Sequence, residues 1–284
     1  MTTARPRRMV VTGCSSGFGL VIAKEALRRG WQVFGTVRKP ADGEVLQAAG
    51  GTVGLLDLTD AASCQRCAEA IAAWCEGALD CVVHNAGTAY PAPMVGADRE
   101  DLRQQFEVNT FGQLDFNGRL IAPLLAAQGM SLFISSISSQ MPTALLGAYA
   151  ASKRALEAMA ESLAMEMGPL GLTVHVVRPG SYKTSIWGTS VPRGDKYLET
   201  DRQLPEAVER HYKRLGRKIR RVATEQPLAD PEQFGRYVLA IAEGGRRRRF
   251  YHVTPALAKA QQLFSWLLPT RAFHRLIRMI LGRS

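Results

Sequence analysis

The sequence has no apolar run long enough to cross a bilayer, although the chain is 284 residues long. Residues 1–9 are basic and lack the apolar stretch of a signal peptide. No internal repeat and no low-complexity linker divides the chain, and its 46% hydrophobic and 21% charged residues are typical of a globular protein. We therefore expect a folded enzyme or binding domain without a membrane span.

Cysteine is scarce, and the cysteines do not form a metal-binding pattern. All five lie in the first third of the chain: Cys14, Cys64, Cys67, Cys75 and Cys81. Cys64 and Cys67 form a lone CxxC, with no second pair and no nearby histidine to complete a zinc site. The helical pattern of residues 61–76 places both thiols near a buried face. We predict reduced thiols, no metal, and a reducing, cytoplasmic compartment.

Acidic residues are outnumbered by basic ones, with 25 Asp and Glu against 36 Lys and Arg, which gives a net charge of +11. The excess gathers late in the chain, at residues 213–221 and 246–249 and in the arginines of the C-terminal segment. No nucleic-acid partner is expected, because no aromatic-rich single-strand platform or zinc-finger spacing accompanies the charge. A solvated basic rim with some affinity for acidic groups is the simpler interpretation.

Short apolar runs alternate with helical patterns along most of the chain. The expected strands are residues 9–12, 32–37, 52–56, 79–84, 131–136, 173–177 and 250–253. The expected helices are residues 17–29, 61–76, 99–125, 147–167, 205–221 and 231–243. This rhythm predicts an α/β fold, a single Rossmann-type doubly wound parallel sheet with helices on both faces. The domain should cover residues 1–254, with a substrate lid at about 181–222, followed by a C-terminal amphipathic helical extension at 255–284.

Three glycines mark the junction between the first expected strand and the first expected helix. Residues 12–19 read Thr-Gly-Cys-Ser-Ser-Gly-Phe-Gly. Glycine lets the backbone turn tightly and approach a pyrophosphate, while the helix N-terminus offers free N–H groups and the positive end of its dipole. A simple turn would not need three glycines at this spacing. The segment therefore predicts a dinucleotide site.

No acidic residue follows the second expected strand. An acid at that point usually binds the ribose hydroxyls of NAD, but here Arg38 and Lys39 follow Val37. Two cations suit a phosphate group on the ribose, although a pair of solvated loop cations would leave the same pattern. The cofactor we expect is NADP(H).

Tyr149 and Lys153 stand four residues apart in the expected helix 147–167. Residues at this spacing share a helix face, so the phenol and the ammonium can lie side by side. A nearby cation favours phenolate, and we expect it to lower the pKa of Tyr149 from its ordinary value of about 10. Ser136, at the end of the preceding expected strand, could hydrogen-bond a substrate oxygen. Three other serines are alternatives to it, and only the spacing to the tyrosine favours Ser136: Ser135, Ser138 and Ser139.

Together these motifs resemble the short-chain dehydrogenase/reductase superfamily over residues 8–253. Residues 12–19 match its TGxxxGxG motif, residues 85–87 its NAG motif and residues 149–153 its YxxxK motif. The segment after the sixth strand is matched by Pro179, Gly180 and Thr184. The resemblance implies an oxidoreductase that interconverts a carbonyl and an alcohol, acts on CH–OH groups and uses NADP(H).

The resemblance also implies a role for each matched position. Tyr149 would be the general acid/base, Ser136 would orient and polarise the carbonyl, and Lys153 would bind the nicotinamide ribose and tune Tyr149. Asn109 would hold a water in a proton relay to Lys153. The residues implied to bind the cofactor are Gly13, Ser15, Ser16, Gly17, Phe18, Gly19, Arg38, Asp57, Leu58, Asn85, Ala86, Gly87, Tyr149, Lys153, Pro179, Gly180 and Thr184.

Three of the positions need separate comment. Asp57 would meet the adenine, or it could equally be a turn residue at the end of a strand. Thr184 would meet the carboxamide end of the nicotinamide. His84 stands where the family usually has asparagine, and we expect an imidazole at that strand end to be structural rather than catalytic.

Within the superfamily, the chain is most similar to the 17β-hydroxysteroid and retinol dehydrogenase-like group, which implies a bulky apolar substrate such as a steroid, a retinoid or a lipid-like molecule. Tyr182 and Trp187 in the lid could line an apolar pocket, or could simply pack the lid onto the body. One alternative is a 3-oxoacyl thioester reductase, whose acidic carrier protein or coenzyme A would meet the basic helix at 205–221. Another is a low-turnover NADP(H)-sensing binding protein, which would not need the proton-transfer residues.

The C-terminal extension and the long helices suggest partners. Residues 263–281, interrupted by Pro269, have the apolar and arginine-bearing faces of an interfacial helix, so peripheral membrane contact is an alternative to docking on the body or on another subunit. The family resemblance implies a homodimer or homotetramer through the helices at 99–125 and 147–167.

Overall fold

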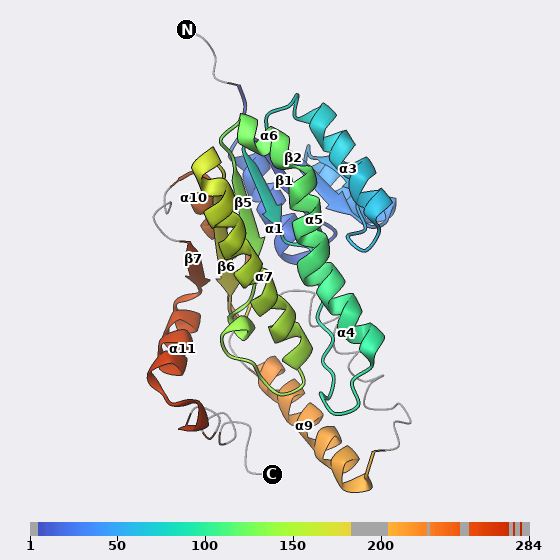
Figure 1. Cartoon of the computed structure of the whole chain (residues 1–284), viewed down its shortest axis with the longest axis vertical. Coiled ribbons are helices and arrows are strands. Elements are labelled where there is room, and N and C mark those ends of the chain that lie inside the picture. The colour runs from blue at the N-terminus through green and yellow to red at the C-terminus, as the bar shows by residue number, and fades with distance from the viewer. Residues whose placement is uncertain are drawn as a thin grey trace.

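A parallel β-sheet forms the centre of the protein (Figure 1). The computed structural model describes residues 5–182, 204–225, 228–244, 250–272, 275 and 279, and the statements below concern these residues. Their seven strands are β1 (Arg8–Val11), β2 (Gln32–Val37), β3 (Thr52–Leu55), β4 (Cys81–His84), β5 (Met130–Ile134), β6 (Thr173–Pro179) and β7 (Tyr251–Thr254). All neighbours pair in parallel, in the order β3-β2-β1-β4-β5-β6-β7. The predicted doubly wound α/β fold is confirmed.

The connections between the strands are helical. The α-helices are α1 (Gly17–Arg28), α2 (Glu44–Ala48), α3 (Ala61–Trp74), α4 (Arg99–Phe106), α5 (Gly112–Arg119), α6 (Ile121–Ala126), α7 (Gly147–Met167), α9 (Glu206–Glu225), α10 (Pro231–Ala242) and α11 (Ala256–Leu267). Shorter 3-10 and π turns are η1 (Pro40–Gly43), η2 (Glu107–Phe111), η3 (Ile137–Ser139) and η4 (Gly168–Leu170). The sequence did not predict η1 and α2, because this segment is too short to show helical periodicity.

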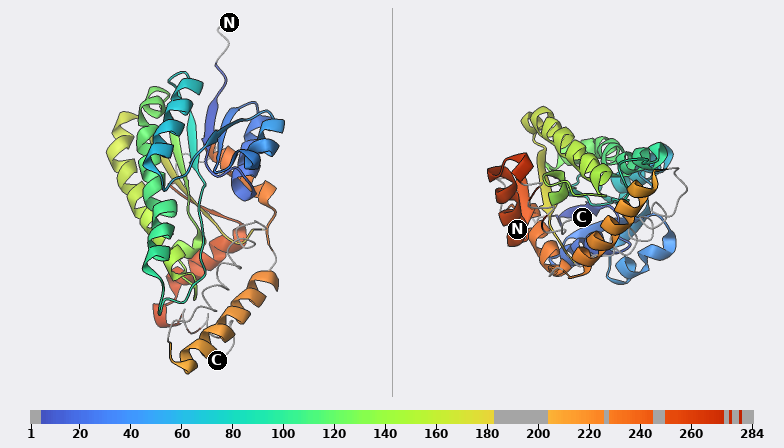
Figure 2. Two further views of the ribbon diagram at one scale, coloured as in Figure 1. Left: turned by 90° about the vertical axis from the view of Figure 1, so that its right-hand side faces the viewer. Right: turned by 90° about the horizontal axis from the view of Figure 1, so that it is seen from below.

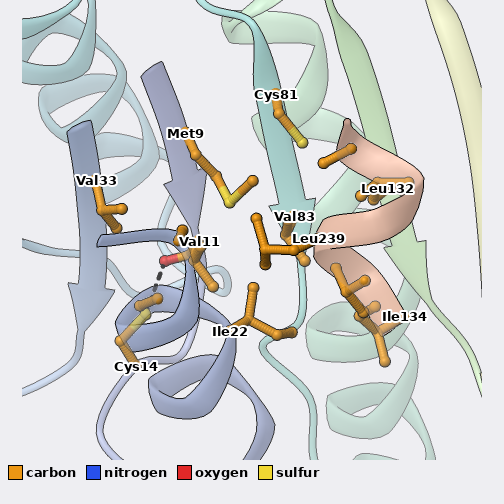
Figure 3. Close-up of a cluster of buried hydrophobic side chains, with 14 of the residues drawn as sticks. Met9, Val11, Cys14, Ile22, Val33, Cys81, Val83, Leu132, Ile134 and Leu239 are labelled. Atoms are coloured by element: carbon orange, nitrogen blue, oxygen red, sulfur yellow. Dashed lines mark hydrogen bonds between the residues drawn. The ribbon is translucent and has the colours of Figure 1, made fainter. Parts of the chain in front are cut away.

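Alternating side chains of the strands build two apolar layers, one on each face of the sheet. On β1, Met9 and Val11 point to the face covered by α1 and α10, where Leu239 packs (Figure 3). Val10 belongs to the apolar cluster on the opposite face. The opposite face is covered by α3, α5 and α7 (Figures 1 and 2). Strands buried on both faces explain why the apolar runs in the sequence are continuous rather than alternating.

The sequence predicts one helix over residues 99–125, and this prediction is wrong in detail. The segment is divided into α4, the π-helical turn η2, α5 and α6. A π turn takes one more residue than an α-turn and so changes which side chains face the protein interior. Asn109 in η2 is completely buried, and its side chain hydrogen-bonds the main chain of Thr88, after β4, and the Ser152 hydroxyl on α7.

The strand order reverses direction between β1 and β4, because β1 is followed by β2 on one side while β4 continues toward β5 on the other. In open α/β sheets a crevice forms at the carboxyl ends of the strands at such a point, and ligands bind there. Helix α9 lies beyond this same edge of the sheet (Figures 1 and 2). The fold therefore brings the glycine-rich turn after β1 and the segment after β4 together at the edge of the sheet that faces α9 (Figure 1).

All five cysteines are buried and unpaired, which agrees with the prediction of reduced thiols. Burial raises the pKa of Cys14 to about 12, that of Cys64 to about 11 and that of Cys67 to about 12. These thiols are therefore poorly reactive in the native protein, because the thiolate is the nucleophile. Among the described residues, no cluster of three or more potential metal ligands occurs. The reducing compartment stays a prediction.

Helix α11 and the surface of the long helices carry exposed apolar side chains. On α11, Leu263, Trp266 and Leu267 are exposed, and so are Phe111 in η2 and Met165 on α7. None of the helices in the described part of the chain is long and apolar enough to cross a membrane. The predicted membrane contact of the C-terminal helix and the predicted oligomer stay predictions, as do the domain limits. Half of the predicted lid at 181–222, residues 183–203, lies outside the described residues.

Candidate active site

The glycine-rich turn after β1 is tied to the end of β4 by hydrogen bonds. The Thr12 hydroxyl accepts from the main-chain N–H groups of Asn85 and Ala86, both at 3.0 Å. In return, the Asn85 side-chain amide donates to the main-chain carbonyls of Thr12 and Gly13, at 2.9 and 3.2 Å. Asn85, predicted to bind the cofactor, therefore also braces the turn that would receive it.

Two glycines are required by close approaches in this turn. Gly13 has a positive φ of 73°, and a Cβ there would lie 2.9 Å from the Cα of Ala86. A Cβ at Gly19 would lie 2.2 Å from the main-chain oxygen of Gly13, so the first turn of α1 can pack against the loop only with glycine at this position. The start of α1 has no side-chain cap and no acidic residue in its first turn. Its positive end therefore suits a phosphate group.

A cavity of about 300 Å³ opens at the carboxyl ends of β1 to β4. Residues that the sequence predicted to bind the cofactor line it: Gly13, Ser15, Ser16, Gly17, Arg38, Asp57, Leu58, Asn85, Ala86 and Gly87. It is also lined by residues that the sequence analysis missed: Thr36, Val37, Asp42, Leu56, Thr59, Thr88, Ala89, Tyr90, Gln104 and Val108. Five of the missed residues directly adjoin a predicted site residue in the sequence: Val37, Leu56, Thr59, Thr88 and Val108. Their position next to predicted residues is the signal that could have found them.

Two polar residues in the cavity illustrate different roles. Arg38 lies just after β2, is exposed and lines the cavity, whereas its neighbour Lys39 is exposed but does not line it. Asp57 lines the cavity as well, and its carboxylate accepts from the N–H and the hydroxyl of Thr59, at 2.9 and 2.7 Å. Asp57 is thus a turn residue at a strand end that also lines the cavity, and its contact with an adenine stays a prediction.

Seven predicted cofactor-binding residues are not among the described residues that line the cavity: Phe18, Gly19, Tyr149, Lys153, Pro179, Gly180 and Thr184. The Phe18 ring packs against the core, with its centroid 4.0 Å from that of the Phe234 ring. Gly19 supports the turn described above. Pro179 ends β6, and Gly180 packs where a Cβ would come within 2.7 Å of Ala258. Thr184 lies outside the described residues.

Tyr149 and Lys153 occupy successive turns of α7, as predicted. The Lys153 ammonium is buried and donates to the main-chain carbonyl of Ile134 at 2.8 Å. Burial lowers the pKa of Lys153 to about 8, against the opposing effect of the Glu157 carboxylate. The predicted direction for Tyr149 is wrong: burial raises its pKa, and a hydrogen bond with Ser136 offsets only part of the rise. Near neutral pH the phenol therefore keeps its proton, and Tyr149 can act as a proton donor.

The structure distinguishes among the four candidate serines. Ser135 and Ser139 both donate to the Glu157 carboxylate, each at 2.6 Å. Ser136 instead hydrogen-bonds Tyr149, and its hydroxyl accepts from the N–H of Ser138 at 3.1 Å. Ser136 is thus the serine placed beside the tyrosine, which is the choice that the spacing favoured.

Asn109 connects the segment after β4 with α7. Its side-chain oxygen accepts from the Thr88 N–H at 2.8 Å, and its amide donates to the Thr88 carbonyl at 2.8 Å and to the Ser152 hydroxyl at 3.1 Å. The side chain thus already has protein partners, so the water predicted for a proton relay would have to be held by another atom of this residue. The geometry makes Asn109 a brace between the two halves of the site.

Gly87 is the point where the cavity meets these residues. It lines the cavity, and a Cβ at this position would lie 3.2 Å from the Asn109 side-chain oxygen and 3.4 Å from the Lys153 ammonium. A ligand lying along the cavity wall at Gly87 would therefore come close to Lys153. The cavity therefore approaches the side of α7 that carries Lys153, one helical turn from Tyr149.

His84 is structural, as expected. Its ring stacks on Phe133, with centroids 4.6 Å apart, and its Nε2 lies 3.0 Å from the Asn117 side-chain oxygen. That oxygen also accepts from the Ser131 hydroxyl at 2.7 Å, so Nε2 is the donor. Burial lowers the pKa of His84 to about 4, and the imidazole is neutral.

Comparison with known proteins assigns this site to a family. The model of the short chain dehydrogenase family matches residues 7–193. NADPH-dependent 3-dehydrocapnine reductase of Ornithobacterium rhinotracheale is 33% identical over 250 residues, which cover 82% of this chain and 88% of that protein. NADPH-dependent 1-acyldihydroxyacetone phosphate reductase of Schizosaccharomyces pombe is 32% identical over 199 residues, 70% of this chain and 66% of that protein. A short-chain dehydrogenase structure from Streptomyces avermitilis superposes with a TM-score of 0.79 at 27% identity, covering 95% of both chains. The chain belongs to the short chain dehydrogenase family and is an oxidoreductase.

Proposed function

We propose that the protein is an NADP(H)-dependent oxidoreductase that interconverts a carbonyl and an alcohol, with Tyr149 as its general acid/base. The observation that carries this proposal is the junction at Gly87, which lines the cavity and where an added Cβ would lie 3.2 Å from the Asn109 oxygen and 3.4 Å from the Lys153 ammonium. Tyr149, which keeps its proton near neutral pH, lies on the same helix as Lys153 and hydrogen-bonds Ser136, which follows the end of β5. This arrangement combines a place for a hydride carrier with a proton donor.

The residues of the chain divide the work as follows. A bound nicotinamide supplies or accepts the hydride. Ser136 donates a hydrogen bond to the substrate oxygen and orients it toward the Tyr149 hydroxyl, which transfers its proton as the oxygen becomes negative. Lys153 holds positive charge beside the site below pH about 8, which stabilises the phenolate that remains after the transfer. In the direction of oxidation the same residues act in reverse.

NADP(H) is the cofactor that the residues support. Arg38 lines the cavity after β2, where an acid would bind the free ribose hydroxyls of NAD. Its guanidinium suits a ribose phosphate. The names of both relatives described above include dependence on NADPH. The glycines at positions 13, 17 and 87 leave the cavity wall open to close approach by the cofactor.

The substrate that we propose is a bulky, lipid-like carbonyl compound or its alcohol, as the resemblance to the 17β-hydroxysteroid and retinol dehydrogenase-like group implied. One relative is named for a substrate with an acyl group, a ketone and a phosphate. In this chain, α9 lies beyond the carboxyl edge of the sheet and exposes Lys213, Arg214 and Arg217. These cations favour an anionic group on the substrate. A 3-oxoacyl thioester, which is carried by coenzyme A or an acidic carrier protein, is therefore the second candidate.

A substrate panel tests the function directly. NADPH oxidation, followed by nicotinamide absorbance, should be fastest with long-chain ketones that carry an anionic head group, slower with steroid and retinoid carbonyls, and slowest with small ketones. Charge reversal of Lys213, Arg214 and Arg217 should raise KM for anionic substrates and leave a neutral ketone of equal chain length unaffected. Tight NADPH binding without turnover of any carbonyl would favour the NADP(H)-sensing alternative instead.

The rate of carbonyl reduction should fall as the pH rises through about 8. Lys153 has a pKa lowered to about 8, so its ammonium is charged below that pH and neutral above it. Tyr149, whose pKa is raised by burial, stays protonated over the same range and does not cause the decline. A profile of kcat/KM from about pH 6 to about pH 10 should show this limb. The variant Lys153→Arg should show no such decline, because arginine does not lose its charge in this range. A wild-type rate that stays level to about pH 10 would contradict the assignment of the decline to Lys153.

A further inference from the structure

A buried ion pair lies one helical turn beyond Lys153. Glu157 on α7 and Arg178 on β6 form two hydrogen bonds, each 2.8 Å long, and the two residues are 2% and 6% exposed. The Arg178 guanidinium also lies 3.6 Å from the centre of the Tyr251 ring on β7. A buried ion pair is seldom more stable than apolar side chains of the same volume. Stability alone is therefore a poor explanation for this pair.

The Glu157 carboxylate holds the segment that carries Ser136. Ser135 and Ser139 donate to one carboxylate oxygen, each at 2.6 Å, and the Gln140 amide donates to the other at 3.0 Å. The Ser139 hydroxyl is also 2.7 Å from the main-chain oxygen of Ser136. One buried carboxylate thus fixes the residues on both sides of the serine that faces Tyr149.

The same carboxylate acts on Lys153 through its charge. It raises the pKa of the ammonium and so opposes the effect of burial. The other groups around Lys153 are Tyr149 on its own helix, Asn109 from η2 and the main-chain oxygen of Ile134 from β5, of which only Tyr149 titrates. Behind Glu157 lie Arg178, which neutralises part of its charge, and Tyr251, whose pKa is raised mainly by burial.

We propose that Glu157, held by Arg178, is a positioning residue of the active site that fixes Ser136 opposite Tyr149. Its negative charge, one helical turn away, also favours the ammonium form of Lys153. The role deepens the proposed function and rests on it. Arg178 fixes the carboxylate through two parallel hydrogen bonds, a geometry that lysine cannot reproduce. The carboxylate then accepts from the two serines and the glutamine at the same time, which no apolar side chain could do.

Glu157→Gln tests the proposal. The variant keeps the side-chain shape but loses the charge and one acceptor. We expect kcat for carbonyl reduction to fall on the order of 10-fold, because the serine and tyrosine lose their alignment, while KM for NADPH stays unchanged. The basic limb of the pH profile should move to lower pH, because loss of the carboxylate lowers the pKa of Lys153. NMR of lysines labelled with ¹³C at Cε reports the same shift without any substrate.

A second variant separates positioning from folding. Glu157→Gln leaves Arg178 buried without its partner, and the double variant Glu157→Gln with Arg178→Met removes that unpaired charge. The double variant should be more stable to heat than the single one, yet kcat should stay low and the Lys153 resonance should still titrate at lower pH. Recovery of wild-type kcat in the double variant would overturn the proposal, since the pair would then serve only folding.

Glu166→Gln is the matched control, because Glu166 is an exposed carboxylate near the end of the same helix and contacts Ser162. It should leave kcat, the pH limb and the Lys153 resonance as in the wild type. If the wild-type protein reduced no carbonyl at all, the proposed function would fail, but the NMR titration would still decide whether Glu157 sets the pKa of Lys153. An unchanged Lys153 titration in Glu157→Gln overturns the proposal.

Discussion

Replacing Tyr149 by phenylalanine should reduce kcat for carbonyl reduction by about 100- to 10,000-fold, the range that general acid catalysis contributes. The substitution removes the hydroxyl alone, and with it the only proton that the phenol can give to a substrate oxygen. Burial keeps that proton in place near neutral pH, so its loss should be felt across the whole working range. The measurement is steady-state NADPH oxidation with the best substrate of the panel.

NADPH binding provides the internal control for this variant. Tyr149 is not among the residues that line the nucleotide cavity, so the dissociation constant for NADPH, measured by nicotinamide fluorescence, should change by less than about threefold. Retained binding with lost turnover would assign the residue to proton transfer. Turnover within about tenfold of the wild type would show that another group supplies the proton.

Arg38→Asp should reverse the preference between the two nicotinamide cofactors. The guanidinium lost here would make charge-assisted hydrogen bonds to a ribose phosphate, and the aspartate would repel that phosphate. We expect the affinity for NADPH to fall on the order of 100-fold or more. An aspartate at this position can also accept from the free ribose hydroxyls of NADH, so the affinity for NADH should rise.

Lys39→Asp, which changes the local charge by the same two units, is the control for Arg38→Asp. Both cations are exposed and adjacent, but only Arg38 lines the cavity. If the effect depended only on local positive charge, the two variants would weaken NADPH binding to a similar extent. If Lys39→Asp lowered the affinity for NADPH more than Arg38→Asp, the ribose phosphate would be bound by Lys39 instead of Arg38. Both dissociation constants can be measured by fluorescence at one fixed salt concentration.

The sheet and the nucleotide cavity were predictable because local patterns determine them. The apolar runs are continuous where strands are buried on both faces, and Gly13 and Gly19 stand where only glycine fits. Residues at the carboxyl ends of neighbouring parallel strands must meet at one edge, so the motifs around Arg38 and Asn85 were expected near each other. Their placement around one cavity follows from the strand order.

The details that were mispredicted depend on contacts between distant residues. Helical periodicity over residues 99–125 contains no sign of the π turn at η2, which is held by bonds from Asn109 to Thr88 and Ser152. The pKa of Tyr149 was expected to fall because only the neighbouring cation was visible, whereas burial by the folded chain raises it. The four serines could be separated only once Glu157 was seen to engage two of them.

The π turn at η2 is less stable than regular α-helix, but it directs Asn109 toward Thr88 and Ser152 in the candidate active site. A regular α-helix is the more favourable backbone conformation, and π turns persist mainly at functional sites. Deleting a single residue between Glu107 and Phe111 would allow the chain to continue as an ordinary helix, at some gain in local stability. The same deletion would rotate Asn109 away from Thr88. A homologue that had lost this extra residue would therefore keep the fold while its catalytic site lost the link between β4 and α7.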